Sequence, residues 1–165
     1  MATKSNAAGD AGLNARPSLT LKRRLNAPPA KVWAAWTSAE KITHWFGPAQ
    51  TQDGSVRAEL DVRVGGRYRA SFTTADGEYH EVGGVYHEVI PNQRLVFSWA
   101  WHSTPERESL VTVSLKPDGA GTLLTLQHEQ FFDQAAADGH RNGWIGSLDR
   151  LERFLPEPSL RPKFI

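Results

Sequence analysis

The sequence lacks cysteine, long apolar segments and an excess of charge of either sign. Without cysteine among its 165 residues, it can hold no disulfide framework, no thiolate nucleophile and no cysteine-ligated zinc. No apolar run approaches the roughly 20 residues that a membrane-spanning helix needs. Its 19 Lys and Arg residues against 18 Asp and Glu residues leave a formal net charge of +1. This balance gives no general attraction to nucleic acid or to an acidic membrane. The absence of cysteine is compatible with the cytoplasm without requiring it, and we expect a cytoplasmic protein.

Motifs for metals, phosphates and nucleophilic serine are also lacking. None of the six histidines shows the close paired spacing of a zinc-binding helix, so we expect no metal. The glycine pairs Gly65-Gly66 and Gly83-Gly84 are not followed by a helix and do not form a phosphate loop. No serine elbow is present, and the N-terminus lacks the apolar stretch of a signal peptide. The sequence therefore predicts no cofactor.

The composition predicts one domain with a tail at each end. Residues 1–17 are rich in Ala, Gly, Asn and Ser and predict a flexible tail. Residues 156–165 contain three prolines and predict an extended C-terminal tail. The segment between them, residues 18–155, is long enough for one domain with a sizeable core.

Apolar residues follow strand periodicity first and helix periodicity last. Residues 18–25 predict a strand, and Pro28-Pro29 begins a short helix. Thr37 and Glu40 have the spacing of a capping box for a second short helix. About six antiparallel strands follow, and Gly83-Gly84 is a candidate bulge.

The final segment, residues 133–155, predicts a long helix that is interrupted or kinked near Gly139. Its apolar stripe comprises Trp144, Leu148, Leu151 and Leu155. The order of elements predicts an α+β fold, with a curved antiparallel sheet of about seven strands wrapped on the C-terminal helix. Such an arrangement leaves space between helix and sheet, which is a common place for a ligand.

Tryptophan is abundant, with six residues in the chain. Trp99 and Trp101 are two apart in a strand and therefore point from the same face. They line a cavity in one interpretation, together with Phe72 from another strand and with Trp144 and Leu148 from the helix. In the other interpretation these side chains fill an ordinary core, since aromatic residues dominate protein interiors. The sequence leaves both interpretations open.

Histidines supply the candidate acid or base groups. His128 shares a strand face with two leucines, which suits a general acid or base or a ligand anchor, and equally suits a histidine bonded to backbone. The candidate bulge obscures the register nearby, so the pattern leaves open which of His80, Glu81, His87 and Glu88 point inward.

Several segments together resemble a known superfamily. They are LTLKRRLNAPPAKVWAAWTSAEKITHWFGP, GGVYHEVIPNQRLVFSWAW, TLLTLQHEQFFD and GHRNGWIGSLDRLERFL. Over residues 18–155 the chain resembles the SRPBCC superfamily, also called START-like or Bet v-like. Within it, the chain is most similar to bacterial relatives of the activator of the 90-kDa heat-shock protein ATPase. The resemblance implies a helix-grip fold with a hydrophobic cavity.

The function predicted first is the binding of a small hydrophobic or aromatic molecule in that cavity. One alternative is a protein-interaction module in the stress response, with a chaperone partner. Another is a polyketide cyclase-like or hydrolase-like enzyme that uses the same cavity. A homodimer is compatible with the resemblance and with each of these three functions. A cavity of ligand size favours binding, whereas a filled core with an exposed apolar patch favours a protein partner.

Overall fold

The computed structural model describes residues 16–155, and the order of elements matches the expected α+β arrangement. The elements are β1 (Leu19–Leu25), α2 (Pro29–Thr37), α3 (Ala39–Ile42), β2 (Arg57–Leu60), β3 (Arg67–Thr73), β4 (Tyr79–Ile90), β5 (Arg94–Trp101), β6 (Ser109–Asp118), β7 (Gly121–Glu129) and α4 (Gln134–Phe154). The predicted tails, residues 1–17 and 156–165, lie outside the described residues except for residues 16 and 17.

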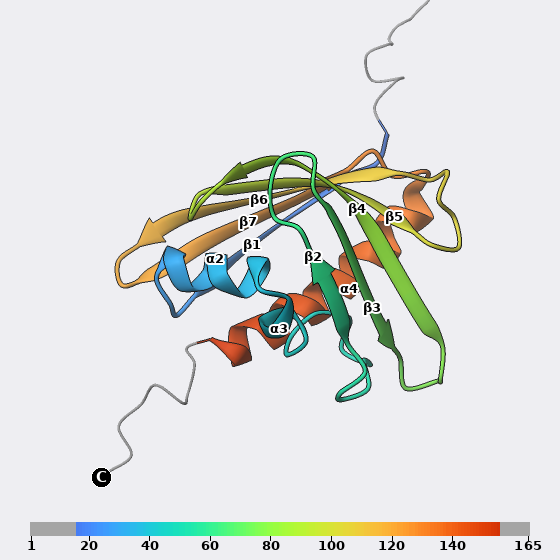
Figure 1. Cartoon of the computed structure of the whole chain (residues 1–165), viewed down its shortest axis with the longest axis horizontal. Helices are drawn as coiled ribbons and strands as arrows, with labels where there is room; N and C mark the ends of the chain where they lie inside the picture. Colours follow the sequence, from blue (N-terminus) through green and yellow to red (C-terminus); the bar gives the residue numbers. More distant parts are fainter. Residues whose placement is uncertain (1–15, 156–165) are drawn as a thin grey trace, which may run out of the picture.

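One antiparallel sheet holds all seven strands in the order β1-β7-β6-β5-β4-β3-β2. Five of the connections join neighbours along the chain, and the first strand closes the order by pairing with the last, as in Leu21 opposite Leu126. The sheet arches over α4, which crosses its concave side (Figure 1). This is the helix-grip fold that the sequence predicted.

Each of the two short helices begins at a residue that suits the start of a helix. Pro28 is the N-cap of α2 and Pro29 its first residue, a position where proline's missing N–H costs nothing. The predicted capping box at Thr37 and Glu40 is wrong. Ser38 caps α3 instead, with its hydroxyl accepting from Lys41 N at 3.2 Å. Thr37 is instead the last residue of α2, where its hydroxyl donates to the carbonyl of Trp33 at 2.8 Å.

The long helix α4 starts at the cap Asp133, whose carboxylate accepts from Ala136 N at 2.8 Å. It continues without interruption from Gln134 to Phe154, so the predicted break near Gly139 is wrong. A glycine costs a helix only about 1 kcal/mol, which packing of the apolar face offsets. Leu148 and Leu151 on that face are completely buried.

The predicted bulge lies further along β4 than expected. Gly83 pairs with Ala100 in regular register, and the register shifts only between Tyr86 and Glu88. Gly84 is needed for another reason, because a Cβ there would lie 2.1 Å from the carbonyl oxygen of Ser98. The regular register around Gly83 keeps Phe72, Trp99 and Trp101 on the face that looks toward α4.

Candidate functional site

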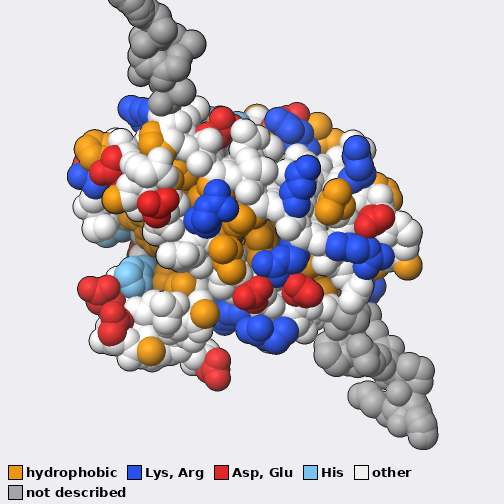
Figure 2. Space-filling view, turned by 180° about the vertical axis from the view of Figure 1, so that it is seen from behind, with side chains coloured by type: hydrophobic (Ala, Val, Ile, Leu, Met, Phe, Trp, Pro, Cys, Tyr) orange, Lys and Arg blue, Asp and Glu red, His pale blue; other side chains and the backbone are white. Residues whose placement is uncertain are grey.

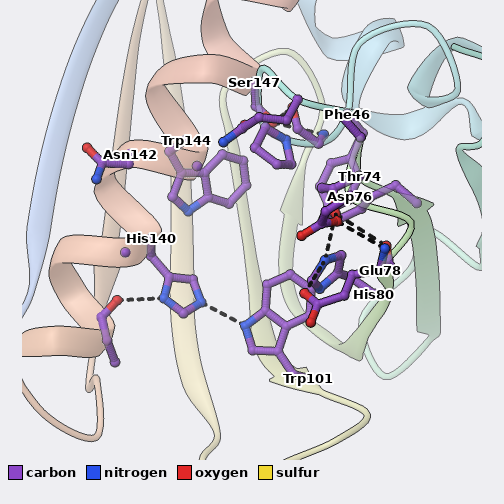
Figure 3. A pocket seen from close by; sticks show the side chains of 18 of the residues that line it. Phe46, Thr74, Asp76, Glu78, His80, Trp101, His140, Asn142, Trp144 and Ser147 are labelled. Atoms are coloured by element: carbon purple, nitrogen blue, oxygen red, sulfur yellow. Dashed lines mark hydrogen bonds and ion pairs between the residues drawn. The ribbon is translucent and has the colours of Figure 1, made fainter. Parts of the chain in front are cut away.

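A pocket of about 670 Å³ lies between the N-terminal half of α4, the end of β5 and the hairpin joining β3 to β4. Figure 3 shows this arrangement, with His140 and Trp144 on α4 facing Thr74, Asp76 and His80 across the space. Pockets that take small organic molecules commonly measure about 300–1,000 Å³. The cavity that the sequence predicted between helix and sheet is therefore present and has the size of a ligand site.

Five aromatic side chains from four parts of the fold form the apolar wall. They are Phe46 from the segment after α3, Phe72 from β3, Trp99 and Trp101 from β5, and Trp144 from α4. The rings touch one another in tilted or edge-on contacts. The centroids of Trp99 and Trp101 are 5.4 Å apart, and those of Trp99 and Trp144 are 5.1 Å apart. Such contacts hold each ring in one orientation, so the wall is a preformed aromatic surface.

His140 fixes the two tryptophans of β5 and was missed by the sequence analysis. Its Nε2 accepts from Trp101 Nε1 at 2.8 Å and from Trp99 Nε1 at 3.3 Å. Its Nδ1 lies 2.7 Å from the carbonyl oxygen of Ala136, which can only accept. We therefore assign the proton to Nδ1 and a neutral ring. Burial lowers the pKa of His140, which agrees with this assignment.

A signal for His140 exists in the sequence. It precedes Trp144 by four residues, so it lies on the same side of α4 as the stripe that continues through Leu148. Extending that stripe one turn toward the helix start would have brought His140 into the predicted cavity.

His128, the candidate acid or base, lies in the core behind the pocket. Its side chain is completely buried and does not line the pocket. Trp144 Nε1 donates to its Nδ1 at 3.0 Å, and we assign its Nε2–H as the donor to Ser109 Oγ at 2.8 Å. Burial, with a smaller contribution from His140, lowers the pKa of His128 to about 2. The ring is therefore neutral near pH 7 and serves as the acceptor that orients Trp144.

Of the six residues predicted to bind ligand, the structure brings four into the pocket wall: Phe72, Trp99, Trp101 and Trp144. Leu148, like His128, lies outside the wall and is fully buried. It continues the stripe of α4 beyond the pocket, into the closed part of the interface. Ligand contact by the four wall residues stays a prediction.

The rim of the pocket opposite α4 is polar. Thr74 Oγ1 donates to Asp76 Oδ1 at 2.6 Å, and His80 Nε2 lies 3.2 Å from the same hydroxyl. Glu78 Oε1 is 3.6 Å from His80 Nε2. The pKa of Asp76 is lowered by the hydrogen bond from Thr74 and by that from the backbone N–H of Glu78. Gly77, with φ of +86°, forms the tight turn that brings Thr74 and Glu78 together, where Thr74 N donates to the carbonyl of Glu78 at 2.9 Å.

The register of β4, which is regular around Gly83 and shifts between Tyr86 and Glu88, settles the residues whose direction the sequence left open. His80 lines the pocket and stacks on Phe72 with ring centroids 5.0 Å apart. Glu81 lies on the other face of the strand, where Tyr79 donates to it at 2.8 Å. His87 is exposed, and Glu88 accepts from Arg94 at 2.8 Å. His80 is thus the one member of the four in the pocket wall.

The arrangement suits noncovalent binding of an apolar molecule. The two hydroxyls in the wall are committed, because Thr74 donates to Asp76 and Ser147 donates to the carbonyl of Gly47 at 2.8 Å. Among residues 16–155, no three His, Asp or Glu side chains are grouped so that they could hold a metal ion. In the same part of the chain, no helix is both long and apolar enough to cross a membrane.

Fold and pocket together define a START-like helix-grip protein with an aromatic cavity. Residues 26–156 match the family described as activator of Hsp90 ATPase homolog 1-like protein, and the chain belongs to this family. The match covers most of the domain, which confirms the resemblance drawn from the sequence segments. No curated protein matches the chain significantly.

Solved structures of bacterial proteins share the fold. A protein from Chromobacterium violaceum is 27% identical with a TM-score of 0.72, covering 83% of this chain and 96% of its own. An uncharacterized protein from Rhizobium leguminosarum is 30% identical with a TM-score of 0.69, covering 84% of this chain and 93% of its own. The AHSA1 protein from Silicibacter pomeroyi is 25% identical with a TM-score of 0.70, covering 83% and 96%. Family and fold support a ligand-binding or activator module in general.

Proposed function

We propose that the protein binds a small hydrophobic or aromatic molecule in the pocket between α4 and the β3–β4 hairpin. The observation that carries this proposal is the wall of five aromatic side chains around a space of about 670 Å³. Phe72, Trp99, Trp101 and Trp144 are the proposed contact residues, with Phe46 added from the structure. A flat apolar ligand would gain by leaving water and by stacking on the rings.

Binding without chemistry fits the site better than catalysis. The histidine that the sequence offered as acid or base, His128, has no access to the pocket. His140 uses both ring nitrogens to hold Trp101 and the helix backbone. A cyclase-like activity would therefore depend on His80, at the polar rim, and on the shape that the wall imposes on a substrate.

The indole N–H signals of the tryptophans provide the test. We would titrate ¹⁵N-labelled protein with 2-(naphthalen-2-yl)ethanol, an uncharged two-ring probe, and record NMR spectra. The signals of Trp99, Trp101 and Trp144 should move with the probe, whereas that of Trp33, outside the wall on α2, should not. Saturable shifts restricted to Trp33, or no shifts, would contradict the proposal.

A matched pair of variants completes the test. Trp101→Ala removes half-buried wall surface and should weaken probe binding on the order of tenfold. Trp33→Ala removes the same residue type from a partly buried position on α2 and should leave the affinity unchanged. Equal affinities in the two variants would mean that the probe binds elsewhere.

The family description favours a second candidate function, an interaction module for a chaperone ATPase. This function, a homodimer and a cytoplasmic location remain predictions from the sequence. The ATPase rate of purified 90-kDa heat-shock protein, measured with and without an equimolar amount of this chain, tests it. An unchanged rate would leave small-molecule binding as the proposal.

A further inference from the structure

The charged side chains in the pocket wall are all acidic. Asp76 and Glu78 contribute carboxylates from the β3–β4 hairpin, and the wall contains neither Lys nor Arg among the described residues. The nearby cation Arg150 is not part of the wall and donates to the carbonyl of Phe46 at 2.8 Å. An anionic ligand would therefore meet two carboxylates and, apart from His80 beside Glu78, no basic side chain at the hairpin side of this wall.

The hydrogen-bond donors of the aromatic wall are already in use. Trp99 and Trp101 donate their indole N–H groups to His140, and Trp144 donates to His128. The wall therefore offers a ligand aromatic ring surface rather than free indole donors, and the quadrupole of an aromatic ring attracts positive charge to its face. The remaining neutral amides, Gln50 and Asn142, can accept as readily as donate.

The carboxylates are held where a charged group could reach them. Asp76 uses Oδ1 for the hydrogen bonds from Thr74 and from Glu78 N, which leaves Oδ2 without a partner. The two hydrogen bonds also favour the ionised form of Asp76. Both acidic side chains are exposed, so they can pair with a group at the pocket mouth at a much smaller desolvation cost than a buried pair would have.

Polar and apolar parts of the pocket are separated in space. In Figure 3, Trp144 and His140 lie on the α4 side, whereas Thr74, Asp76 and Glu78 lie together on the hairpin side. Figure 2 shows acidic side chains and a histidine gathered at the lower left, over the hairpin end, while most Lys and Arg side chains on this face lie over its centre and right. This separation fits a molecule with an apolar body and a cationic end.

From these observations we propose that the natural ligand is a flat aromatic or apolar molecule that carries a protonated amine or another organic cation. The cation lies at Asp76 and Glu78, and the body stacks on Trp99 and Trp101. This inference rests on the proposed function, since it assigns the ligand class of the same pocket.

Three two-ring probes of nearly equal size test the charge preference. They are the cation 2-(naphthalen-2-yl)ethylammonium, the uncharged alcohol used above, and the anion 2-(naphthalen-2-yl)acetate. The dissociation constant of each probe is measured by NMR titration at low ionic strength. The ammonium should bind about fivefold more tightly than the alcohol, given the strength of cation–π contacts and exposed ion pairs. The acetate should bind more weakly than the alcohol.

Two double variants with equal loss of charge locate the source of the preference. Asp76→Asn with Glu78→Gln keeps the turn acceptor for Glu78 N but removes both charges, and the ammonium preference should fall to about twofold or less. The control, Glu88→Gln with Asp118→Asn, removes two carboxylates that pair with Arg94 and Arg24 away from the pocket. It should keep the full preference.

The outcomes separate the two proposals. If the alcohol binds and the ammonium binds no more tightly, or if the acetate binds best, the cation inference is overturned and the proposed function stands. A preference that survives in the Asp76 and Glu78 variant overturns the inference as well. If none of the three probes binds at millimolar concentration, the proposed function fails together with it.

Discussion

The contact between α4 and the rest of the fold is tightly packed in the C-terminal half of the helix and leaves a pocket beside its N-terminal half. In the C-terminal half, Leu148 and Leu151 are fully buried, and a Cβ on Gly146 would lie 2.5 Å from Ala49 N. In the N-terminal half, a Cβ on Gly139 or Gly143 would meet no atom within 4 Å. The same helix thus closes against the fold at one end and borders empty space at the other.

Where the two halves meet, hydrogen bonds join α4 to the segment after α3. Ser147 Oγ accepts from Gly47 N at 2.9 Å and donates to Gly47 O at 2.8 Å, and Arg150 donates to Phe46 O. These bonds hold α4 against the segment after α3 next to the pocket. Stability and binding therefore depend on different halves of one helix, and substitutions should separate them.

Leu148→Ala should cause the largest loss of stability, because it creates a cavity in the closed half. Removing a fully buried leucine side chain typically lowers the free energy of unfolding by about 2–5 kcal/mol. Urea denaturation followed by far-ultraviolet circular dichroism measures this loss. The folded variant should still bind the naphthyl probes. A stability change below about 1 kcal/mol would show that this half is less tightly packed than the structure indicates.

The second-largest expected effect is a loss of folding stability at acid pH, caused by His128 in the core. Its pKa is about 2 in the folded state, below the ordinary value of about 6.5 expected for the unfolded chain. The unfolded state therefore binds the proton first. Stability is complete above about pH 7 and falls by about 1.4 kcal/mol per pH unit below pH 6.5, or about 2 kcal/mol by pH 5.

Denaturation curves at pH 8, 6.5 and 5 test this slope, with His128→Asn as the matched variant. Asparagine can still accept from Trp144 but does not titrate, so the variant should be less stable at pH 8 and lose less stability on acidification. His140→Gln should also flatten the slope, because burial lowers that pKa too. Equal slopes in the native protein and in both variants would show that acid acts elsewhere.

Features that a single element displays in its own sequence were predictable. The periodicities of residues 18–25 and of Trp144, Leu148 and Leu151 predicted a strand and a buried helix face, and both are present. These patterns follow from burial on one face, which each element displays in its own sequence. The tryptophan pair Trp99 and Trp101 likewise predicted a common face, and both line the pocket.

The polar rim of the pocket and the surroundings of His128 were not predictable, because each depends on contacts between several elements. The rim joins Asp76 and His80 to a wall from α4, and nothing local to the hairpin indicates that partner. His128 was assigned a possible chemical role because its strand shows only an apolar face with one histidine. Its donor Trp144 and its acceptor Ser109 come from other elements. Whether a histidine is sealed in the core or open to a pocket is decided by that tertiary environment.

The glycines of α4 offer the smallest but most direct test of the contrast between its halves. Gly143→Ala adds a methyl group into open space and should raise the free energy of unfolding by up to about 1 kcal/mol, because alanine favours helix. The same methyl group narrows the pocket and should weaken probe binding.

Gly146→Ala gains the same helix propensity, but its methyl group meets the backbone of Ala49. The free energy of unfolding should therefore fall by about 1 kcal/mol. Thermal denaturation and probe titration of both variants measure the two effects. Changes of stability in the same direction would mean that α4 packs alike along its length.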